Sequence, residues 1–438
     1  MTLSRPIGID LFAGAGGLSL GFEQAGFDVP AAVEIDPIHC AIHEFNFPCS
    51  TAICASVVDL TGDAIRRRAG IGDREIDVVF GGAPCQGFSL IGKRALDDPR
   101  NQLVFHYVRL VRELQPNYCV FENVPGLTVG PHQRFLRELI EAFQEAGYDV
   151  LLPYRVLNAA DFRVPQGRRR LFLIGAKQGL PLPAYPAPIG RTTVAEAIDD
   201  LPDADRFQEL LASDSVAVSF DTVHPYARRL RGLESDPADY SHPRSFDPDR
   251  LTSSLRTEHT ELSRRRFTQT PQGKVESVSR FHKLAPHGLC NTLRAGTDSA
   301  RGAFTSPRPI HYRFPRVITV REAARLHSYP DWFRFHATKW HGFREIGNSV
   351  PPLLGRAVAG EIMKALGCSA EKPEKSLLLG HDSESLLKFD MSEAAAHFGV
   401  PANTIAQRTR NITPRERAEK QQVEMPDDLR AHETRARP

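Results

Sequence analysis

The chain of 438 residues lacks several features that would place it in other classes of protein. It has only seven cysteines, at positions 40, 49, 54, 85, 119, 290 and 368, and none of them form a C-x-x-C pair. A disulfide framework and a zinc site are therefore not expected, and we predict no metal centre. Scattered free thiols are typical of a reducing compartment, so we expect the protein in the cytoplasm.

Long apolar runs and a strong net charge are also missing. No run approaches the roughly 18 apolar residues of a membrane span. The N-terminus reaches the charged strand candidate Ile9-Asp10-Leu11-Phe12 too soon for a signal peptide. The formal net charge is only +2, so any basic surface must be local. We therefore expect an ordinary soluble globular protein, with no membrane partner and room for two domains.

The first 185 residues alternate short apolar runs with amphipathic stretches. Strands are predicted at 6–12, 29–35, 52–58, 76–82, 117–122, 148–157 and 170–176. Helices are predicted between them at 18–26, 37–46, 101–115 and 132–146. This alternation is typical of an α/β protein with a doubly wound sheet. Residues 1–185 are accordingly predicted to form the first part of a catalytic, cofactor-binding domain.

The rest of the chain divides into four segments that differ in composition and in predicted regular structure. A proline-rich stretch at 181–188 precedes an irregular second domain, predicted at 186–315. Residues 316–367 are expected to form a recognition hinge and the return to the catalytic domain, with Thr319 capping a helix and a last helix after Pro351-Pro352. Residues 368–390 are predicted to be a linker. The tail, 391–438, resembles a helix-turn-helix in the spacing of Ala395, Gly399 and Ile405, and a plain helical appendage or a partly disordered tail is the alternative interpretation.

Two chemically useful side chains follow neighbouring strand candidates. Cys85 lies in the turn Gly81-Gly82-Ala83-Pro84-Cys85-Gln86-Gly87, and Glu122 ends the strand candidate Tyr118-Cys119-Val120-Phe121. Open α/β folds keep their ligands at this carboxyl edge of the sheet. A thiolate beside a proton-donating carboxyl can add to C6 of a cytosine while N3 is protonated, which makes C5 nucleophilic. The alternative for Cys85 is an inert buried cysteine, and for Glu122 a solvated strand end.

A glycine-rich turn and an acidic strand end predict a cofactor that contains adenosine. The turn Phe12-Ala13-Gly14-Ala15-Gly16-Gly17 joins the first strand to a helix, and glycines there allow a ligand close to the backbone. Glu34 ends the second strand, where a carboxylate can bind ribose hydroxyls. The spacing is not that of the dinucleotide fingerprint, and a glycine turn with only a packing role remains the alternative.

The chain contains six motifs in the order in which one protein family has them. They are F-A-G-A-G-G, E-I-D-P, P-C-Q-G-F-S, F-E-N-V, Q-G-R-R-R and G-N-S-V-P-P, between residues 7 and 366. The chain is similar to DNA (cytosine-5)-methyltransferases of the bacterial, restriction-modification type. The resemblance implies a Rossmann-like S-adenosylmethionine-dependent methyltransferase fold with a smaller, irregular target-recognition domain and a C-terminal helical extension. It also implies transfer of the methyl group of S-adenosyl-L-methionine to C5 of a flipped-out cytosine.

The resemblance assigns roles residue by residue. Cofactor binding falls to Phe12, Gly14, Gly16, Gly17, Glu34, Ile35, Asp59, Pro84, Leu103 and Asn348. Within that set, Phe12 would pack on adenine, Glu34 would bind ribose, and Asp59 would accept from the adenine amino group. Cys85 would be the nucleophile, Glu122 the acid, Arg170 the contact to the cytosine O2, and Arg168 the residue that orders phosphate or the catalytic loop. DNA contacts are expected from Gln86, Ser89, Gln166, Thr292 and Arg294.

The segment 190–315 is rich in arginine, which reads guanine edges bidentately and also binds phosphate. These arginines are 264, 265, 266, 280, 294, 301, 308 and 313. Solvated loops balanced by nearby acids are the alternative for any one of them. The partners expected are double-stranded DNA and a restriction endonuclease without a stable complex, and the protein is expected to be a monomer. A tRNA cytosine-5-methyltransferase and a DNA-binding regulator without catalysis are the competing functions.

Overall fold

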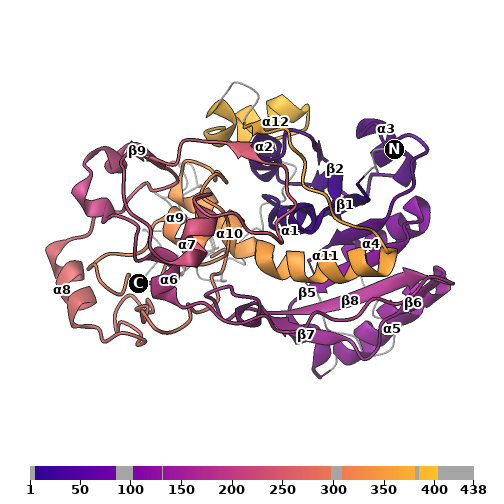
Figure 1. Ribbon diagram of the computed structural model, residues 1–438, viewed down its shortest axis with the longest axis horizontal. Coiled ribbons are helices and arrows are strands. Elements are labelled where there is room, and N and C mark those ends of the chain that lie inside the picture. The colour runs from indigo at the N-terminus through magenta and orange to yellow at the C-terminus, as the bar shows by residue number, and fades with distance from the viewer. Residues whose placement is uncertain (1–4, 85–101, 131, 297–307, 380–383, 403–438) are drawn as a thin grey trace, which may run out of the picture.

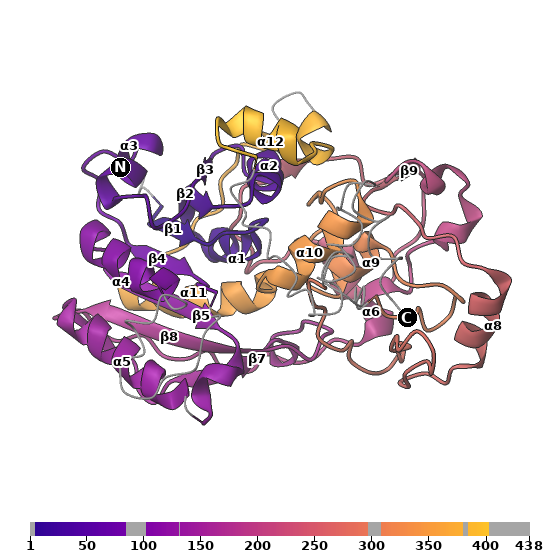
Figure 2. The same ribbon diagram turned by 180° about the vertical axis from the view of Figure 1, so that it is seen from behind.

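The computed structural model describes residues 5–84, 102–130, 132–296, 308–379 and 384–402. Figure 1 shows two lobes, one built on a sheet and its helices and the other on short helices and irregular chain. Figure 2 shows the same two lobes from behind. Helix α11 (Pro352–Leu366) belongs to the sheet lobe although it comes late in the sequence. It lies alongside helix α1 (Gly17–Ala25), which comes near the start of the chain.

An eight-stranded sheet forms the first lobe and confirms the predicted fold class. Its strands are β1 (Ile7–Leu11), β2 (Asp28–Glu34), β3 (Thr51–Cys54), β4 (Val78–Gly81), β5 (Tyr118–Asn123), β6 (Tyr148–Val150), β7 (Arg155–Asn158) and β8 (Arg169–Lys177). The order is β3-β2-β1-β4-β5-β8-β6, with β7 also paired to β8. The first five strands are parallel to one another, and β8 runs antiparallel to them beside β5. Strands β6 and β7 both pair antiparallel with β8, so they run in the same direction as the first five. The single strand predicted at 148–157 is therefore two strands.

Alternation along the strands explains why helices cover both faces of the sheet. Val78 and Phe80 belong to the apolar cluster with α1 and α11, whereas Val79 between them packs with the opposite cluster. Successive side chains of a strand point to opposite faces, so a strand buried on both sides is apolar throughout. The helices of the second face are α3 (Gly62–Arg68), α4 (Gln102–Leu114) and α5 (His132–Glu145). Helix α2 (Pro37–Asn46) packs near the β2–β3 edge.

Buried arginines hold the second lobe together, because its regular elements are short. These elements are α6 (Val194–Ile198), β9 (Val216–Ala217), α7 (Pro225–Leu230), β10 (Arg244–Ser245), β11 (Arg250–Leu251), α8 (Glu261–Gln269), α9 (Val320–Arg325) and α10 (Lys339–Asn348). The guanidinium of Arg325 is fully buried and pairs with Asp200 and Asp331, each at 2.7 Å. Charge-assisted pairs of this kind are the stronger class of hydrogen bond.

The segment 316–367 contributes to both lobes. Helices α9 and α10 pack into the apolar cluster of the second lobe with residues such as Val194 and Leu284. Only α11 lies on the sheet. Thr319 does cap α9, and its hydroxyl and the Glu322 carboxylate form a reciprocal capping box.

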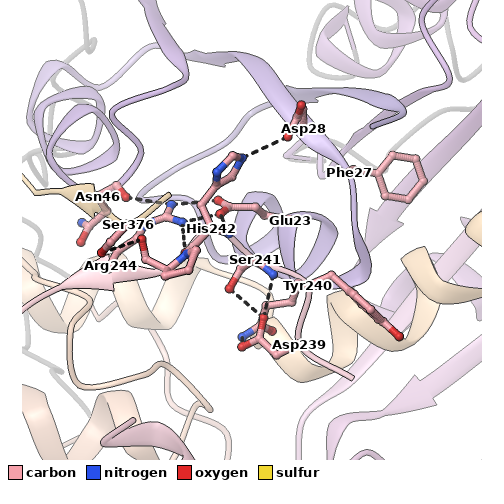
Figure 3. Close-up of polar contacts among 12 residues, drawn as sticks. Glu23, Phe27, Asp28, Asn46, Asp239, Tyr240, Ser241, His242, Arg244 and Ser376 are labelled. Atoms are coloured by element: carbon pink, nitrogen blue, oxygen red, sulfur yellow. Dashed lines mark hydrogen bonds and ion pairs between the residues drawn. The ribbon is translucent and has the colours of Figure 1, made fainter. Parts of the chain in front are cut away.

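Residues 239–245, which we call the strap, extend from the second lobe to α1 and the start of β2 in the sheet lobe (Figure 3). The Arg244 guanidinium pairs with both carboxylate oxygens of Glu23 on α1, at 2.9 Å for one of them, and His242 Nε2 lies 3.2 Å from Asp28 at the start of β2. Strand β12 (Leu377–Leu378) pairs with β10 of this strap. The segment predicted as a linker, 368–390, is thus folded in part against the body of the protein.

The C-terminal extension continues this packing on α2. Leu386 and Leu387, in a short 3-10 helix (Glu384–Leu387), join an apolar cluster with Ala41, Ile42 and Phe45. Helix α12 (Met391–Phe398) follows and lies beside α2. Its N-cap is Asp390, whose side chain accepts from the backbone N–H groups of Ser392 and Glu393. The second helix of the predicted helix-turn-helix, with Ile405, lies outside the described residues.

Candidate active site

A cavity of about 430 Å³ opens at the carboxyl edge of the parallel strands, where the sequence predicted the ligand. Its walls come from the ends of β1, β2 and β5, the chain after β3 and β4, helix α4 and the turn between α10 and α11. The predicted residues on its wall are Phe12, Gly14, Glu34, Ile35, Pro84, Leu103, Glu122 and Asn348. Eight predicted positions from six separate segments are therefore brought to one place.

The glycine turn has the strained backbone that its sequence predicted. Phe12, Gly14 and Gly16 all have positive φ, at 66°, 55° and 99°. A bulky residue rarely adopts this region, so Phe12 is held there by the surrounding fold. Gly14 lines the cavity, whereas a Cβ on Gly16 would lie 2.3 Å from the Phe47 ring and a Cβ on Gly17 2.5 Å from the Val350 carbonyl. Gly16 and Gly17 therefore shape the turn without forming the wall.

Glu34 fixes the floor of the cavity through its carboxylate. One oxygen accepts from the backbone N–H of Gly14 at 2.8 Å, and the other accepts from Ile35 and Asp36, each at 2.9 Å. A carboxylate has about four acceptor positions, so three backbone donors leave capacity for a ligand hydroxyl. Ile35 is 38% exposed at the same wall.

Asp59 does not line the cavity, and its contact with adenine stays a prediction. Its backbone N–H closes a turn onto the Ser56 carbonyl at 3.1 Å, and its side chain is exposed. The turn instead brings Ser56 and Val57 to the wall. The sequence shows an acidic residue after Val57-Val58, but it does not show where the chain turns away after β3.

Glu122 and Arg170 form an ion pair at the rim of the cavity. Glu122 Oε1 lies 2.7 Å from Arg170 Nε, and both side chains are largely buried. Burial raises the pKa of Glu122, although the charges of Arg170 and Arg168 oppose that shift. Gly82 is needed beside it, because a Cβ there would lie 2.5 Å from Glu122 Oε2.

The nucleophile candidate lies just beyond this described part of the chain. Asn123 donates from Nδ2 to the Ala83 carbonyl at 2.8 Å, which ties the end of β5 to the turn that leads to Cys85. Pro84 is the last described residue before 102 and lines the cavity. Cys85, Gln86 and Ser89 lie outside the described residues.

Two of the predicted DNA contacts bond within the protein, the buried Gln166 and the half-buried Thr292. The Gln166 side chain is fully buried and bonds to Leu293 N, Leu326 O and His327 Nδ1. The Thr292 hydroxyl donates to the Gly167 carbonyl at 2.6 Å. Both are engaged by partners more than a hundred residues away, which local sequence cannot reveal. Arg294 is exposed.

Arg168 is also internal and differs from the predicted phosphate or loop contact. It is 1% exposed, and its guanidinium donates to three backbone carbonyls. Several arginines of the recognition segment are likewise paired: Arg264 with Asp205, Arg266 with Glu276 and Arg313 with Asp199. Arg308 stacks on the Phe343 ring at 4.9 Å. Arg265, Arg280 and Arg294 are exposed, and Arg301 lies outside the described residues.

Sequence reasoning missed several residues of the wall. They are Asp10, Leu18, Val33, Asp36, His39, Ser56, Val57, Arg344, Ser349 and Val350. Asp36 and Arg344 pair at 3.1 Å across the cavity wall, from α2 and α10. The motifs E-I-D-P and G-N-S-V-P-P already contain three members of this set, Asp36, Ser349 and Val350, so the signal was present for those positions. Arg344 has no such signal.

Within the described ranges, no helix combines the length and apolarity needed to cross a bilayer. The same residues contain no group of three or more His, Cys, Asp or Glu side chains arranged to hold a metal ion.

Comparison with known proteins agrees with this geometry. A family model described as C-5 cytosine-specific DNA methylase matches residues 8–364. The Type II methyltransferase M.XorII of Xanthomonas oryzae pv. oryzae is 66% identical over 96% of this chain and 100% of its own length. M1.HphI of Haemophilus parahaemolyticus is 35% identical over 81% of this chain and 86% of its own. A crystal structure of a DNA modification methyltransferase encoded within a prophage (E. coli) is 34% identical, covers 83% of this chain and 99% of its own, and has a TM-score of 0.69.

Proposed function

The chain belongs to the C-5 cytosine-specific DNA methylase family and is a DNA (cytosine-5-)-methyltransferase of the restriction-modification type, and from this premise we propose its substrate and mechanism. It methylates C5 of one cytosine within a specific sequence of double-stranded DNA, using S-adenosyl-L-methionine. The base is flipped out of the duplex, at a cost of a few kcal/mol. The observation that carries this proposal is the Glu122–Arg170 pair at the rim of the cavity that Phe12, Glu34 and Asn348 line.

The cavity residues fit the proposed methyl donor. Its volume lies within the range of about 300–1,000 Å³ that is usual for small-molecule sites. Phe12, Ile35 and Leu103 offer apolar surface for an adenine, and Glu34 offers acceptor capacity for ribose hydroxyls. We assign the adenine edge to Ser56 and Val57 in place of Asp59. A bound donor would supply an electrophilic methyl group.

The chain's own residues act on the cytosine. The Cys85 thiolate adds to C6, and Glu122 holds a proton at N3, so that the electron pair released toward C5 makes that carbon nucleophilic. Arg170 contacts O2 and keeps Glu122 oriented. After methylation a base removes the C5 proton, the C5–C6 double bond re-forms, and the Cys85 thiolate leaves. The raised pKa of Glu122 favours the protonated form that this step needs.

The remaining partners follow from the family context. We propose that the protein works as a cytoplasmic monomer, paired in function with a restriction endonuclease that it does not bind stably. The exposed Arg265, Arg280 and Arg294 are our candidates for contact with duplex DNA. A tRNA substrate and a regulator without catalysis are the competing functions.

Conversion-based sequencing tests this proposal directly. Plasmid from cells that express the protein should show one cytosine per recognition site fully resistant to bisulfite, and plasmid from cells with Cys85→Ser should show none. A parallel transfer assay with purified tRNA should give no product. Methylated tRNA with unmethylated plasmid would favour the tRNA function, and wild-type protein that methylates neither would favour the regulator.

A further inference from the structure

The chain segment 290–295, which we call the seam segment, lies between two parts of the active site. On one side, Gly167 N donates to the Cys290 carbonyl at 2.8 Å and Cys290 N donates to the Pro165 carbonyl at 2.9 Å. On the other side, a Cβ on Gly347 would lie 2.2 Å from Ala295 N, so the two backbones are in direct contact. The seam segment therefore cannot shift without moving the chain before β8 or the turn after α10.

One buried guanidinium joins these three stretches of chain. Arg168 donates to the carbonyls of Leu293 at 2.8 Å, Gly347 at 2.9 Å and Ser349 at 2.7 Å. The planar guanidinium presents five N–H donors in a fixed fork, so it can hold several acceptors in one geometry where a lysine ammonium cannot. Loss of these bonds would leave three buried carbonyls without their charged donor.

A second buried link runs parallel to the first. Gln166 accepts from Leu293 N at 3.1 Å through its carbonyl oxygen, and its amide nitrogen lies 2.9 Å from His327 Nδ1. His327 Nε2 in turn lies 3.2 Å from the Ser349 carbonyl. Burial holds the pKa of His327 well below its usual range, so the ring is neutral. Only the tautomer with the proton on Nε2 satisfies both contacts, since Nδ1 must then accept from Gln166 and Nε2 must donate to Ser349.

The two links connect functional positions at both ends. Arg294 follows Leu293 and is exposed, whereas Asn348 stands between Gly347 and Ser349 and lines the donor cavity. Arg170, two residues beyond Arg168, pairs with Glu122. A displacement of the seam segment by a bound nucleic acid would thus reach the donor cavity through hydrogen bonds alone.

We propose that Arg168, Gln166 and His327 are positioning residues that couple nucleic-acid binding at the seam segment to methyl-donor binding in the cavity. The inference rests on the proposed function, because it takes DNA and the donor as the two ligands. Coupling of this kind is reciprocal, so each ligand tightens the other by the same factor. Arg168 would thus link the two sites and would not contact a substrate.

Calorimetric titration with S-adenosyl-L-homocysteine tests the coupling. The affinity is measured for the full chain with and without a duplex that carries the site found by sequencing. Wild-type protein should bind this donor analogue about tenfold more tightly with the duplex. Arg168→Lys keeps the charge but not the forked guanidinium, so it should bring that ratio close to one. The ratio of the two affinities should change more than either affinity does alone.

Matched variants separate coupling from a general loss of structure. Arg169→Lys changes the exposed neighbour of Arg168 and should keep the wild-type ratio. His327→Gln can place an amide N–H toward the Ser349 carbonyl but leaves no acceptor at the position of Nδ1, so it should reduce the ratio in part. This variant decides the matter if Arg168→Lys does not fold. The inference is overturned if the folded variants keep the wild-type ratio of affinities. It is also overturned if the duplex leaves the affinity of wild-type protein for S-adenosyl-L-homocysteine unchanged although that protein methylates DNA. Wild-type protein that methylates no DNA would instead refute the proposed function.

Discussion

Opposing effects act on the carboxyl group of Glu122. Its burial disfavours the charged form and raises the pKa, and Arg170 at 2.7 Å favours the charged form and limits that rise. A group balanced in this way can hold a proton for the substrate near neutral pH and still release it, which a general acid requires. The pair with Arg170 also fixes the direction of the carboxyl oxygens.

Glu122→Gln should therefore lower kcat by about 10²- to 10⁴-fold, the usual range for loss of a general acid. The amide keeps the shape of the side chain but has no proton to transfer. Affinity for S-adenosyl-L-homocysteine should change little, since the cofactor wall is intact. Single-turnover methylation and calorimetry measure the two effects. For the wild-type enzyme, the rate should fall as the pH rises through the raised pKa of Glu122. A kcat near that of wild type in the Gln variant would remove Glu122 from the mechanism.

The buried Asp10 leads to a prediction about how stability depends on pH. It is 1% exposed, and burial raises its pKa from 3.8 to about 8. The folded protein therefore binds one more proton than the unfolded chain between these values, and the free energy of unfolding should decrease as the pH rises from about 4 to 8. Glu345, with a pKa raised to about 8 by burial, adds to the same trend.

Asp10→Asn should flatten part of that dependence, because the amide does not titrate. Urea unfolding at several pH values between 5 and 9 measures it, with the exposed Asp73→Asn as the control. A slope equal to that of wild type in Asp10→Asn would contradict the assignment.

At the scale of elements, the sheet could be predicted and the second lobe could not. Strands such as Val78–Gly81 are continuous apolar runs buried on both faces, and this pattern is visible in the chain itself. The second lobe depends on pairs such as Arg325 with Asp200, which are 125 residues apart, so its arginines were interpreted as DNA contacts. The cavity wall could be predicted where motifs fix it, as at Phe12 and Asn348, whereas the turn after β3 that brings Ser56 and Val57 to the wall could not be predicted.

The strap offers a stability test at this scale. Arg244 and Glu23 are buried together between the strap and α1, so Arg244→Ala should lower the free energy of unfolding by about 3–5 kcal/mol. The reason is the uncompensated charge left on Glu23. Replacing both by Leu should recover most of the loss. The pair between the exposed Lys364 and the half-buried Glu361 serves as the control, and Lys364→Ala should cost at most about 1 kcal/mol. Equal losses in the two alanine variants would contradict the role of the strap.

At the scale of the whole molecule, the C-terminal extension has two parts with different roles. The part up to Phe398 covers α2 through Leu386 and Leu387, and it also holds the 334–338 chain through His336 Nε2 and the Phe389 carbonyl at 3.0 Å. Removing the extension from 380 onward would therefore expose apolar surface and loosen the chain that leads to α10. A cut at that point cannot separate folding from any DNA binding by the tail.

Truncation after residue 402 should give the cleaner result. This protein should keep the wild-type thermal midpoint and methylation rate, whereas truncation after 379 should lower the midpoint by several degrees because of the lost apolar packing. Differential scanning calorimetry and a transfer assay measure both. A gel shift with the protein's own promoter DNA then tests the helix-turn-helix interpretation on the folded, truncated enzyme. Equal midpoints for the two truncations would show that the packing on α2 is unimportant.

In the proposed mechanism, catalysis depends on a covalent bond between Cys85 and the target base. Duplex DNA with 5-fluorocytosine at the methylated position, incubated with S-adenosyl-L-methionine, should trap the enzyme because the fluorine at C5 cannot leave as a proton does. Peptide mass spectrometry should then place the adduct on Cys85, and Cys85→Ser should give none. A methylating enzyme that forms no adduct, or one attached at another residue, would contradict the central claim.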